Sequence, residues 1–151
     1  MGARQLITIL VAAALAGALG VEPSASQPDR SARPYKIIVN PDNRLREVST
    51  VFLREAFLKK SASWSGGETI RPVDLSRRFQ IRERFTREVL NKTPAQLRAY
   101  WNQQIFSGKG VPPPELESEA AVIAYVLHHR GAVAYLPAEA DPRGALVVTL
   151  R

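Results

Sequence analysis

Short apolar runs alternate with segments of helical periodicity along most of the chain, and this alternation constrains the fold more than any other feature. A compact apolar run favours a buried strand, whereas apolar residues that recur every three to four positions favour an amphipathic helix. Such alternation is typical of an α/β domain whose helices cover a mixed or mostly parallel sheet. The predicted strands of one sheet are 35–39, 70–73, 132–136 and 146–150, and the predicted helices are 48–58, 77–90, 94–106 and 118–130.

Residue spacing also predicts how two of these helices begin, end and pack. Thr93 and Pro94 provide an N-cap and a first-turn proline for the helix that follows them. Gly131 is predicted to end the last helix with a positive φ, which glycine adopts easily. Apolar residues four positions apart predict the buried faces. The predicted buried residues are Ile81, Phe85 and Val89 in one helix and Leu97, Tyr100, Trp101 and Ile105 in the next.

Residues 1–26 are predicted to be a secretory signal peptide. Arg4 precedes an uncharged apolar run, and small residues follow this run at 18–20 and at 24–26. The run is short for a bilayer span, so cleavage is favoured, with an uncleaved anchor as the alternative. Residues 27–34, rich in Pro and Ser, are predicted to be a disordered linker, and residues 35–151 one domain. A periplasmic or secreted protein is therefore expected.

Composition and motifs narrow the classes of function. The chain has no cysteine, which excludes structural disulfides, thiolate metal sites, cysteine nucleophiles and a lipoprotein anchor. Its net charge of +7 favours anionic partners, although export argues against nucleic acid. No nucleophile elbow, zinc-protease motif or glycine-rich phosphate loop is present, and the adjacent His128 and His129 have no third ligand in sight. No catalytic residue, metal or cofactor is therefore expected.

The stretch "VDLSRRFQIRERF", at 73–85, concentrates arginines around the start of a predicted helix. The amides at a helix N-terminus and its positive dipole end favour anion binding, and guanidinium groups would add charge. The same residues also fit a solvated helix face, on which pairs such as Glu83 with Arg87 and Arg84 with Glu88 lie four positions apart. The residues alone leave both interpretations open.

Three segments, taken in order, resemble one lobe of the phosphate-binding proteins of ABC transporters. They are "VFLREAFLKKSASWSGGETIRPVD", "RERFTREVLNKTPAQLRAYWNQQIFSGKGVPPP" and "AVIAYVLHHRGAVAYLPA", which together cover nearly all of the chain after residue 34. The resemblance implies a single lobe of a type II periplasmic-binding-protein-like fold, with a mixed sheet flanked by helices. It also implies a non-catalytic solute-binding module related to phosphate ABC transport, with phosphate or another oxyanion as ligand and an ABC transporter or envelope protein as partner.

The resemblance also implies where a ligand would bind. In the family, the turn before the "x-Arg-x-x-Phe" helix carries small hydroxyl residues and glycine, whereas this chain has Arg78, Phe79 and Gln80 there. A weak, open anion site is therefore expected, and the alternative is a protein-interaction module on the same scaffold. The family has two lobes and this chain is long enough for one, so pairing of two copies stays open. The candidate ligand residues are Ser76, Arg77, Arg78, Phe79, Gln80 and Trp64.

Overall fold

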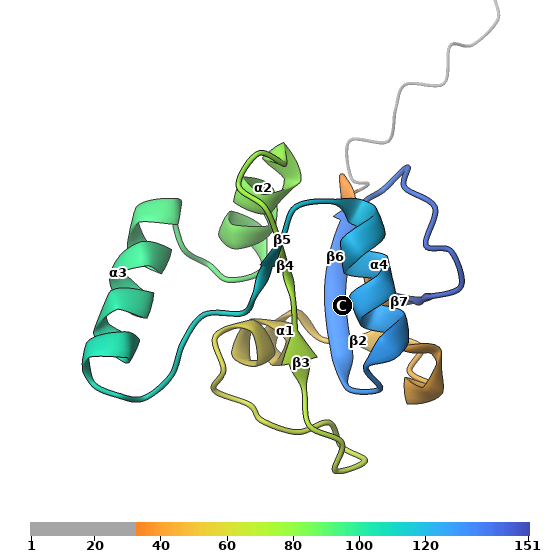
Figure 1. The fold of residues 1–151 in the computed structure, drawn as a ribbon, viewed down its shortest axis with the longest axis horizontal. Helices are drawn as coiled ribbons and strands as arrows, with labels where there is room; N and C mark the ends of the chain where they lie inside the picture. The colour runs from red at the N-terminus through yellow and green to blue at the C-terminus, as the bar shows by residue number, and fades with distance from the viewer. Residues whose placement is uncertain (1–32) are drawn as a thin grey trace, which may run out of the picture.

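A five-stranded mixed sheet organises residues 33–151, the part of the chain that the computed structural model describes (Figure 1). The strands are β1 (Tyr35–Val39), β2 (Glu47–Val48), β3 (Arg71–Pro72), β6 (Ala132–Pro137) and β7 (Leu146–Leu150), and they lie in the order β2-β7-β1-β6-β3. β4 (Asp74–Leu75) and β5 (Glu115–Leu116) form a separate parallel pair. The predicted signal peptide, and the predicted linker up to residue 32, lie outside the described residues.

The register of the sheet confirms the predicted mixed α/β fold. β1 is central and pairs antiparallel with β6 and with β7, so that Ile37 faces Tyr135 on one side and Val148 on the other. The two outer pairs, β3 with β6 and β2 with β7, are parallel. All four predicted strands belong to this one sheet. The sequence did not predict β2, β4 or β5, because two residues are too few to show a periodicity.

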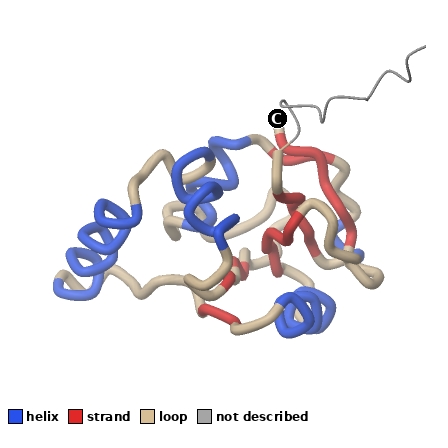
Figure 2. The backbone as a smooth tube through the Cα atoms, turned by 90° about the horizontal axis from the view of Figure 1, so that it is seen from above, coloured by secondary structure: helices blue, strands red, loops and turns tan. Residues whose placement is uncertain are grey.

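Four α-helices surround the sheet. Figure 2 shows α4 on one side of the sheet and α1 with α2 on the other, while α3 stands beside α2, away from the strands. Hydroxyl side chains cap α1, α3 and α4, and α3 has a complete capping box between Thr93 and Gln96, which confirms its predicted start. The helices are α1 (Thr50–Phe57), α2 (Gln80–Glu88), α3 (Pro94–Phe106) and α4 (Glu119–His128), and a 3-10 turn, η1, spans Pro41–Asn43.

An aromatic cluster joins the sheet to α1 and α2. The Phe85 ring of α2 stacks on the Tyr135 ring of β6 with centroids 4.0 Å apart, and Phe57 of α1 lies 4.9 Å from Phe85. Tyr35 of β1 meets the edge of the same cluster, 5.6 Å from Phe85. Phe85 is only 1% exposed. Because these side chains come from four different elements, their burial fixes α2 against the sheet.

The predicted buried faces are largely confirmed. In α2 Phe85 is buried and Ile81 half-buried, and Val89 is buried directly after it. In α3 Leu97 and Trp101 are buried and Tyr100 is half-buried. The prediction for Ile105 is wrong, because this side chain is 49% exposed. The C-terminal end of α3 lies farther from α2 than its N-terminal end does (Figures 1 and 2), and Ile105 lines an open groove there.

The predicted role of Gly131 is also wrong, although the position does require glycine. Gly131 is not among the residues with positive φ, and α4 instead ends at His128, with an extended C-cap residue, His129. A Cβ atom at Gly131 would lie 1.7 Å from the carbonyl oxygen of Thr69. Glycine is therefore needed at this position, because Thr69 in the loop before β3 lies too close to residue 131 to leave room for a side chain.

Within residues 33–151, no helix is both long enough and apolar enough to cross a membrane.

The core assignment predicts a sharp contrast between two phenylalanines. We expect Phe85→Ala to lower the free energy of unfolding by about 3–5 kcal/mol, because it leaves a cavity under the aromatic cluster. Phe106, which is 90% exposed, is the matched control, and Phe106→Ala in dilute solution should change stability by less than about 0.5 kcal/mol. Urea denaturation measures both values, and a similar loss for the two variants would contradict this packing.

Candidate functional site

The turn that leads into α2 is held in place by β5. The amide of Ser76 donates a hydrogen bond to the carbonyl of Leu116 over 2.9 Å, and the amide of Phe79 donates to the carbonyl of Ser76 over 3.1 Å. Ser76 is buried, whereas Arg77 and Arg78 are exposed. The backbone of residues 76–79 is therefore fixed at the β4–β5 edge, and the two arginines project from it into solvent.

The N-terminus of α2 lacks the cap that the other helices of residues 33–151 possess. Its N-cap residue is Phe79, which provides no side-chain hydrogen bond, whereas Ser49, Thr93 and Ser118 cap α1, α3 and α4. The first amides of a helix have no intrahelical acceptor, and the positive end of the helix dipole lies there. The start of α2 can therefore donate hydrogen bonds to an anion.

Arg77 and Arg78 are only loosely paired. Arg77 Nε lies 3.7 Å from Glu115, and Arg78 Nη1 lies 3.8 Å from Glu117, with all four side chains substantially exposed. The Arg78 guanidinium also lies over the Phe79 ring, 5.5 Å from its centroid. Exposed ion pairs of this length contribute little to stability. Both guanidinium groups can therefore exchange their carboxylate partners for another anion.

The remaining exposed arginines of α2 confirm the predicted charged face. Arg84 pairs with Glu88 over 2.7 Å, and Arg87 pairs with Glu83 over 2.8 Å, in both cases four residues apart on the helix. These pairs are largely solvated. The arginine-rich stretch therefore includes the solvated helix face that its sequence suggested, and Arg77 and Arg78 lie in the turn before this helix.

Arg82 differs from the other arginines because it bridges two acidic residues. Its Nη2 lies 2.9 Å from Asp74 Oδ2 and donates a hydrogen bond to Glu115 Oε1 over 2.7 Å. Its Nη1 lies 2.7 Å from Glu115 Oε2, which makes an ion pair without the geometry of a hydrogen bond. The Tyr135 hydroxyl donates a short hydrogen bond to the other oxygen of Asp74. This four-residue network connects α2, β4, β5 and β6.

Burial and pairing set the protonation of the network. Burial raises the pKa of Asp74, although Arg82 and Tyr135 oppose this change. Burial also raises the pKa of Tyr135, and the negative charge of Asp74 raises it further. The hydrogen bond from Arg82 lowers the pKa of Glu115. The charge of Arg82 is therefore already matched inside the protein, which leaves it little capacity to attract a ligand.

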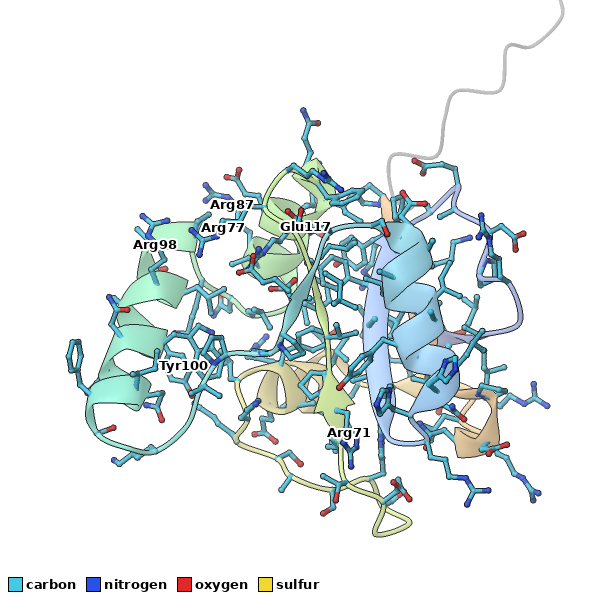
Figure 3. The ribbon with its side chains drawn as sticks, viewed as in Figure 1. Arg71, Arg77, Arg87, Arg98, Tyr100 and Glu117 are labelled. Carbon is cyan, nitrogen blue, oxygen red and sulfur yellow. The ribbon has the colours of Figure 1, made fainter. Side chains whose placement is uncertain are left out.

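A groove of about 520 Å³ runs between α2, α3 and the loop before β5. Pro94, Leu97, Trp101 and Pro113 contribute apolar surface to it. Figure 3 shows Arg77 beside α2 and Arg98 on α3, at the same end of the molecule. The charged side chains that line the groove are Arg77, Arg82, Arg98, Asp74, Glu83 and Glu115. No cluster of metal-ligating side chains occurs in residues 33–151.

The structure brings five of the six candidate ligand residues together and places the sixth elsewhere. Ser76 to Gln80 form the turn and the first residue of α2. Trp64 is 7% exposed, packs 5.3 Å from the Phe52 ring, and donates its indole N–H to the carbonyl of Gly131. It lines a separate pocket with Arg130 and Asp42. Trp64 therefore does not lie beside the candidate anion site.

Three residues beside the start of α2 were not predicted from the sequence, namely Asp74, Glu115 and Tyr135. Asp74 lies in the otherwise apolar segment "PVDL", directly before the arginine-rich helix. An acidic residue in an apolar segment could have indicated a partner among these arginines. Glu115 and Tyr135 had no comparable signal, because only the fold brings β5 and β6 to this position.

The network predicts that Arg82 is far more important for stability than its neighbours. Arg82→Ala would leave the carboxylate of Asp74 buried without its cation, and we expect a loss of about 3–5 kcal/mol. Arg87→Ala removes an exposed pair and should cost less than about 1 kcal/mol. Equal losses in urea denaturation would contradict the buried network.

The lowered pKa of Glu115 predicts how stability depends on acid. Because its folded-state pKa lies below its unfolded value, Glu115 stabilises the protein near neutral pH, and this contribution is lost as pH falls below about 4. The difference in unfolding free energy between the wild type and Glu115→Gln should therefore shrink toward low pH. A difference that stays constant from about pH 7 to pH 3 would contradict the ion pair with Arg82.

Known structures with a similar fold include phosphate transport proteins. They include an ABC-type phosphate transport receptor from Vibrio cholerae (12% identity, TM-score 0.60) and PstS from Borrelia burgdorferi (11% identity, TM-score 0.59). A third is a protein from Clostridium perfringens, assigned as a phosphate ABC transporter substrate-binding protein and crystallised with bound phosphate (14% identity, TM-score 0.60). No protein-family profile and no curated protein matches the sequence.

Each alignment covers 78% of this chain. It covers less than half of the other chain: 46% of the Vibrio protein, 47% of the Borrelia protein and 44% of the Clostridium protein. At such low identity, the likeness establishes the fold alone. It confirms the fold that the sequence motifs implied. Residues 33–151 therefore have the fold of one lobe of a phosphate ABC transporter substrate-binding protein.

Proposed function

We propose that this chain is an exported, non-catalytic solute-binding module that binds phosphate or a related oxyanion weakly at the start of α2. The observation that carries the proposal is the uncapped N-terminus at Phe79, flanked by the loosely paired Arg77 and Arg78. Ser76 supplies the nearby hydroxyl. The fold adds support, because one of its structural neighbours was crystallised with phosphate.

The geometry favours weak binding that depends on salt. Arg77 and Arg78 are solvated, and an incoming anion must compete with Glu115 and Glu117 for them. Arg82 adds little attraction because two carboxylates already match its charge. Charge-assisted hydrogen bonds are strong only where water is excluded, and exposed charges are screened by salt. A dissociation constant in the range of about 1 mM is the expectation for such a site.

The predicted signal peptide places this module outside the cytoplasm, in the periplasm or in the surrounding medium. Its structural neighbours support an ABC transporter as one candidate partner, and an envelope protein is the other candidate that we propose. The neighbouring structures are substrate-binding proteins, and the sequence has no recognised catalytic motif. Both observations support a non-catalytic function.

A protein-interaction module on the same scaffold is the second candidate. The exposed apolar side chains at the end of α3, Ile105 and Phe106, favour it. The two candidates differ in their response to small anions. A solute-binding module is stabilised by its ligand in a saturable way, whereas an interaction module is indifferent until its protein partner is present.

Thermal unfolding in phosphate, sulfate and molybdate at constant ionic strength tests the proposal. At a ligand concentration tenfold above the dissociation constant, the stabilisation should reach about 1.4 kcal/mol. The double variant Arg77→Gln/Arg78→Gln should lose most of this effect and keep its fold, because neither side chain belongs to the core. Constant ionic strength removes the general stabilisation that any salt gives to a basic protein.

The matched control changes two exposed arginines within α2 itself, Arg84 and Arg87. Arg84→Gln/Arg87→Gln lowers the net charge by the same amount, but it leaves the start of α2 intact. It should keep the phosphate effect. Equal losses in the two double variants would show a nonspecific charge effect, and no saturable stabilisation by any of the anions would favour the interaction module.

A further inference from the structure

One face of α3 forms a continuous wall of the groove between α2 and α3. Six residues of this helix line the groove at spacings of three and four, as residues on one helix face do. They are Pro94, Leu97, Arg98, Trp101, Asn102 and Ile105. The groove of about 520 Å³ is within the range of sites that hold small organic molecules. Its size therefore allows a ligand larger than inorganic phosphate.

The acidic side chains of this groove already have partners inside the protein. Arg82 lies 2.9 Å from Asp74 and 2.7 Å from Glu115. Glu83 pairs with Arg87 over 2.8 Å. A carboxylate that is matched by a guanidinium group has little capacity to attract a cationic ligand. The groove therefore does not favour a cation, although three acidic residues line it.

Two arginines of the groove stay available to a ligand. Arg77 is exposed and lies 3.7 Å from Glu115, a loose pair. Arg98 is exposed, and within residues 33–151 no carboxylate lies at ion-pair distance from it. Figure 3 shows both arginines at the end of the molecule where α3 begins. This end of the groove therefore favours an anionic group, for which guanidinium groups are forked donors.

The other end of the groove offers apolar surface. Leu97 and Trp101 are less than 10% exposed, so they close the groove rather than receive a ligand. Ile105 is 49% exposed, and Pro112 in the facing loop is also exposed. Arg98 and Ile105 are two helical turns apart, or about 10 Å along the axis. A complementary ligand is therefore anionic at one end and apolar about 10 Å away.

The open shape of the groove favours a rigid ligand. A flexible chain loses rotational freedom when it binds, and a shallow groove compensates for little of this loss. An aromatic ring system presents a large apolar area and loses little freedom. Phosphate suits the charged end, because its oxygens can accept hydrogen bonds from both guanidinium groups.

We propose that the groove between α2 and α3 binds an aryl phosphate monoester. Its phosphate group lies between Arg77 and Arg98, and its ring system lies against Ile105 and Pro112. This inference extends the proposed function and rests on it only for the choice of phosphate as the charged group. Arg77 is the residue that the groove shares with the start of α2.

Titration of the full chain with 2-naphthyl phosphate, followed by backbone amide chemical shifts at constant ionic strength, tests the proposal. Naphthyl phosphate should bind about tenfold more tightly than inorganic phosphate, because burial of about 60 Å² of ring surface corresponds to such a gain. It should shift the amides of Asn102 and Ile105, which inorganic phosphate should leave unchanged. 2-Naphthol, which lacks the phosphate group, should bind at least about tenfold more weakly than the ester.

A pair of variants at the end of α3 tests the apolar contact. Ile105→Ser should weaken the binding of naphthyl phosphate by about fivefold, because it removes apolar surface from the groove, and it should leave inorganic phosphate binding unchanged. Phe106→Ser is the matched control, since Phe106 is 90% exposed and is not among the residues that line the groove. It should bind naphthyl phosphate as the wild type does.

A pair of arginine variants tests the charged end. Arg98→Gln should weaken the binding of naphthyl phosphate by about fivefold and leave that of inorganic phosphate unchanged, because Arg98 lines the groove and lies outside the turn before α2. Arg78→Gln removes the same charge from the turn, where Arg78 does not line the groove. It should weaken inorganic phosphate binding and leave the tighter binding of naphthyl phosphate unchanged.

Three results would overturn the inference. One is naphthyl phosphate that binds no more tightly than inorganic phosphate. Another is an equal loss of naphthyl phosphate binding in Ile105→Ser and Phe106→Ser, and the third is an equal loss in Arg98→Gln and Arg78→Gln. The proposed function fails separately, if inorganic phosphate gives no saturable shifts at the start of α2. The two failures are therefore distinguishable.

Discussion

The contact on which the rest of this structure depends is the bridge that Arg82 forms between Asp74 and Glu115. β4 and β5 have only two residues each, so their backbone hydrogen bonds provide little stability. Arg82 joins these strands to α2, and Tyr135 joins Asp74 to the central sheet. Phe85, one turn after Arg82, stacks on the same Tyr135. The polar network and the aromatic core therefore hold α2 at one position.

This contact also determines what the start of α2 can bind. Because Arg82 is matched by two carboxylates, an anion at the proposed site would meet the first amides of α2, Arg77 and Arg78, but no unpaired buried cation. Both guanidinium groups are solvated. The proposed site therefore has a favourable charge but is open to water, so we expect low affinity and a strong dependence of binding on salt. The exposed end of α3 is a separate feature of the same surface.

Local sequence signals predicted the elements that are long enough to show a period or a cap. The strand at 35–39, the strand at 146–150 and the helix at 94–106 were predicted with the bounds that the structure has. What the sequence could not predict depends on tertiary contacts. Arg82 and Arg84 look alike in the sequence, yet only Arg82 faces two acids from other elements. Ile105 fits the apolar period of α3, but its side chain lines an open groove and is 49% exposed.

Phosphate titration followed by the backbone amide chemical shifts tests the central claim most directly, because it locates the ligand as well as detecting it. The account predicts saturable shifts centred on Gln80 and Ile81, the first residues of α2, with smaller changes at Arg77 and Arg78. The amides around Trp64 should not respond, since that side chain packs against Phe52 and Gly131. Saturable shifts centred away from the start of α2, or none at all, would contradict the account.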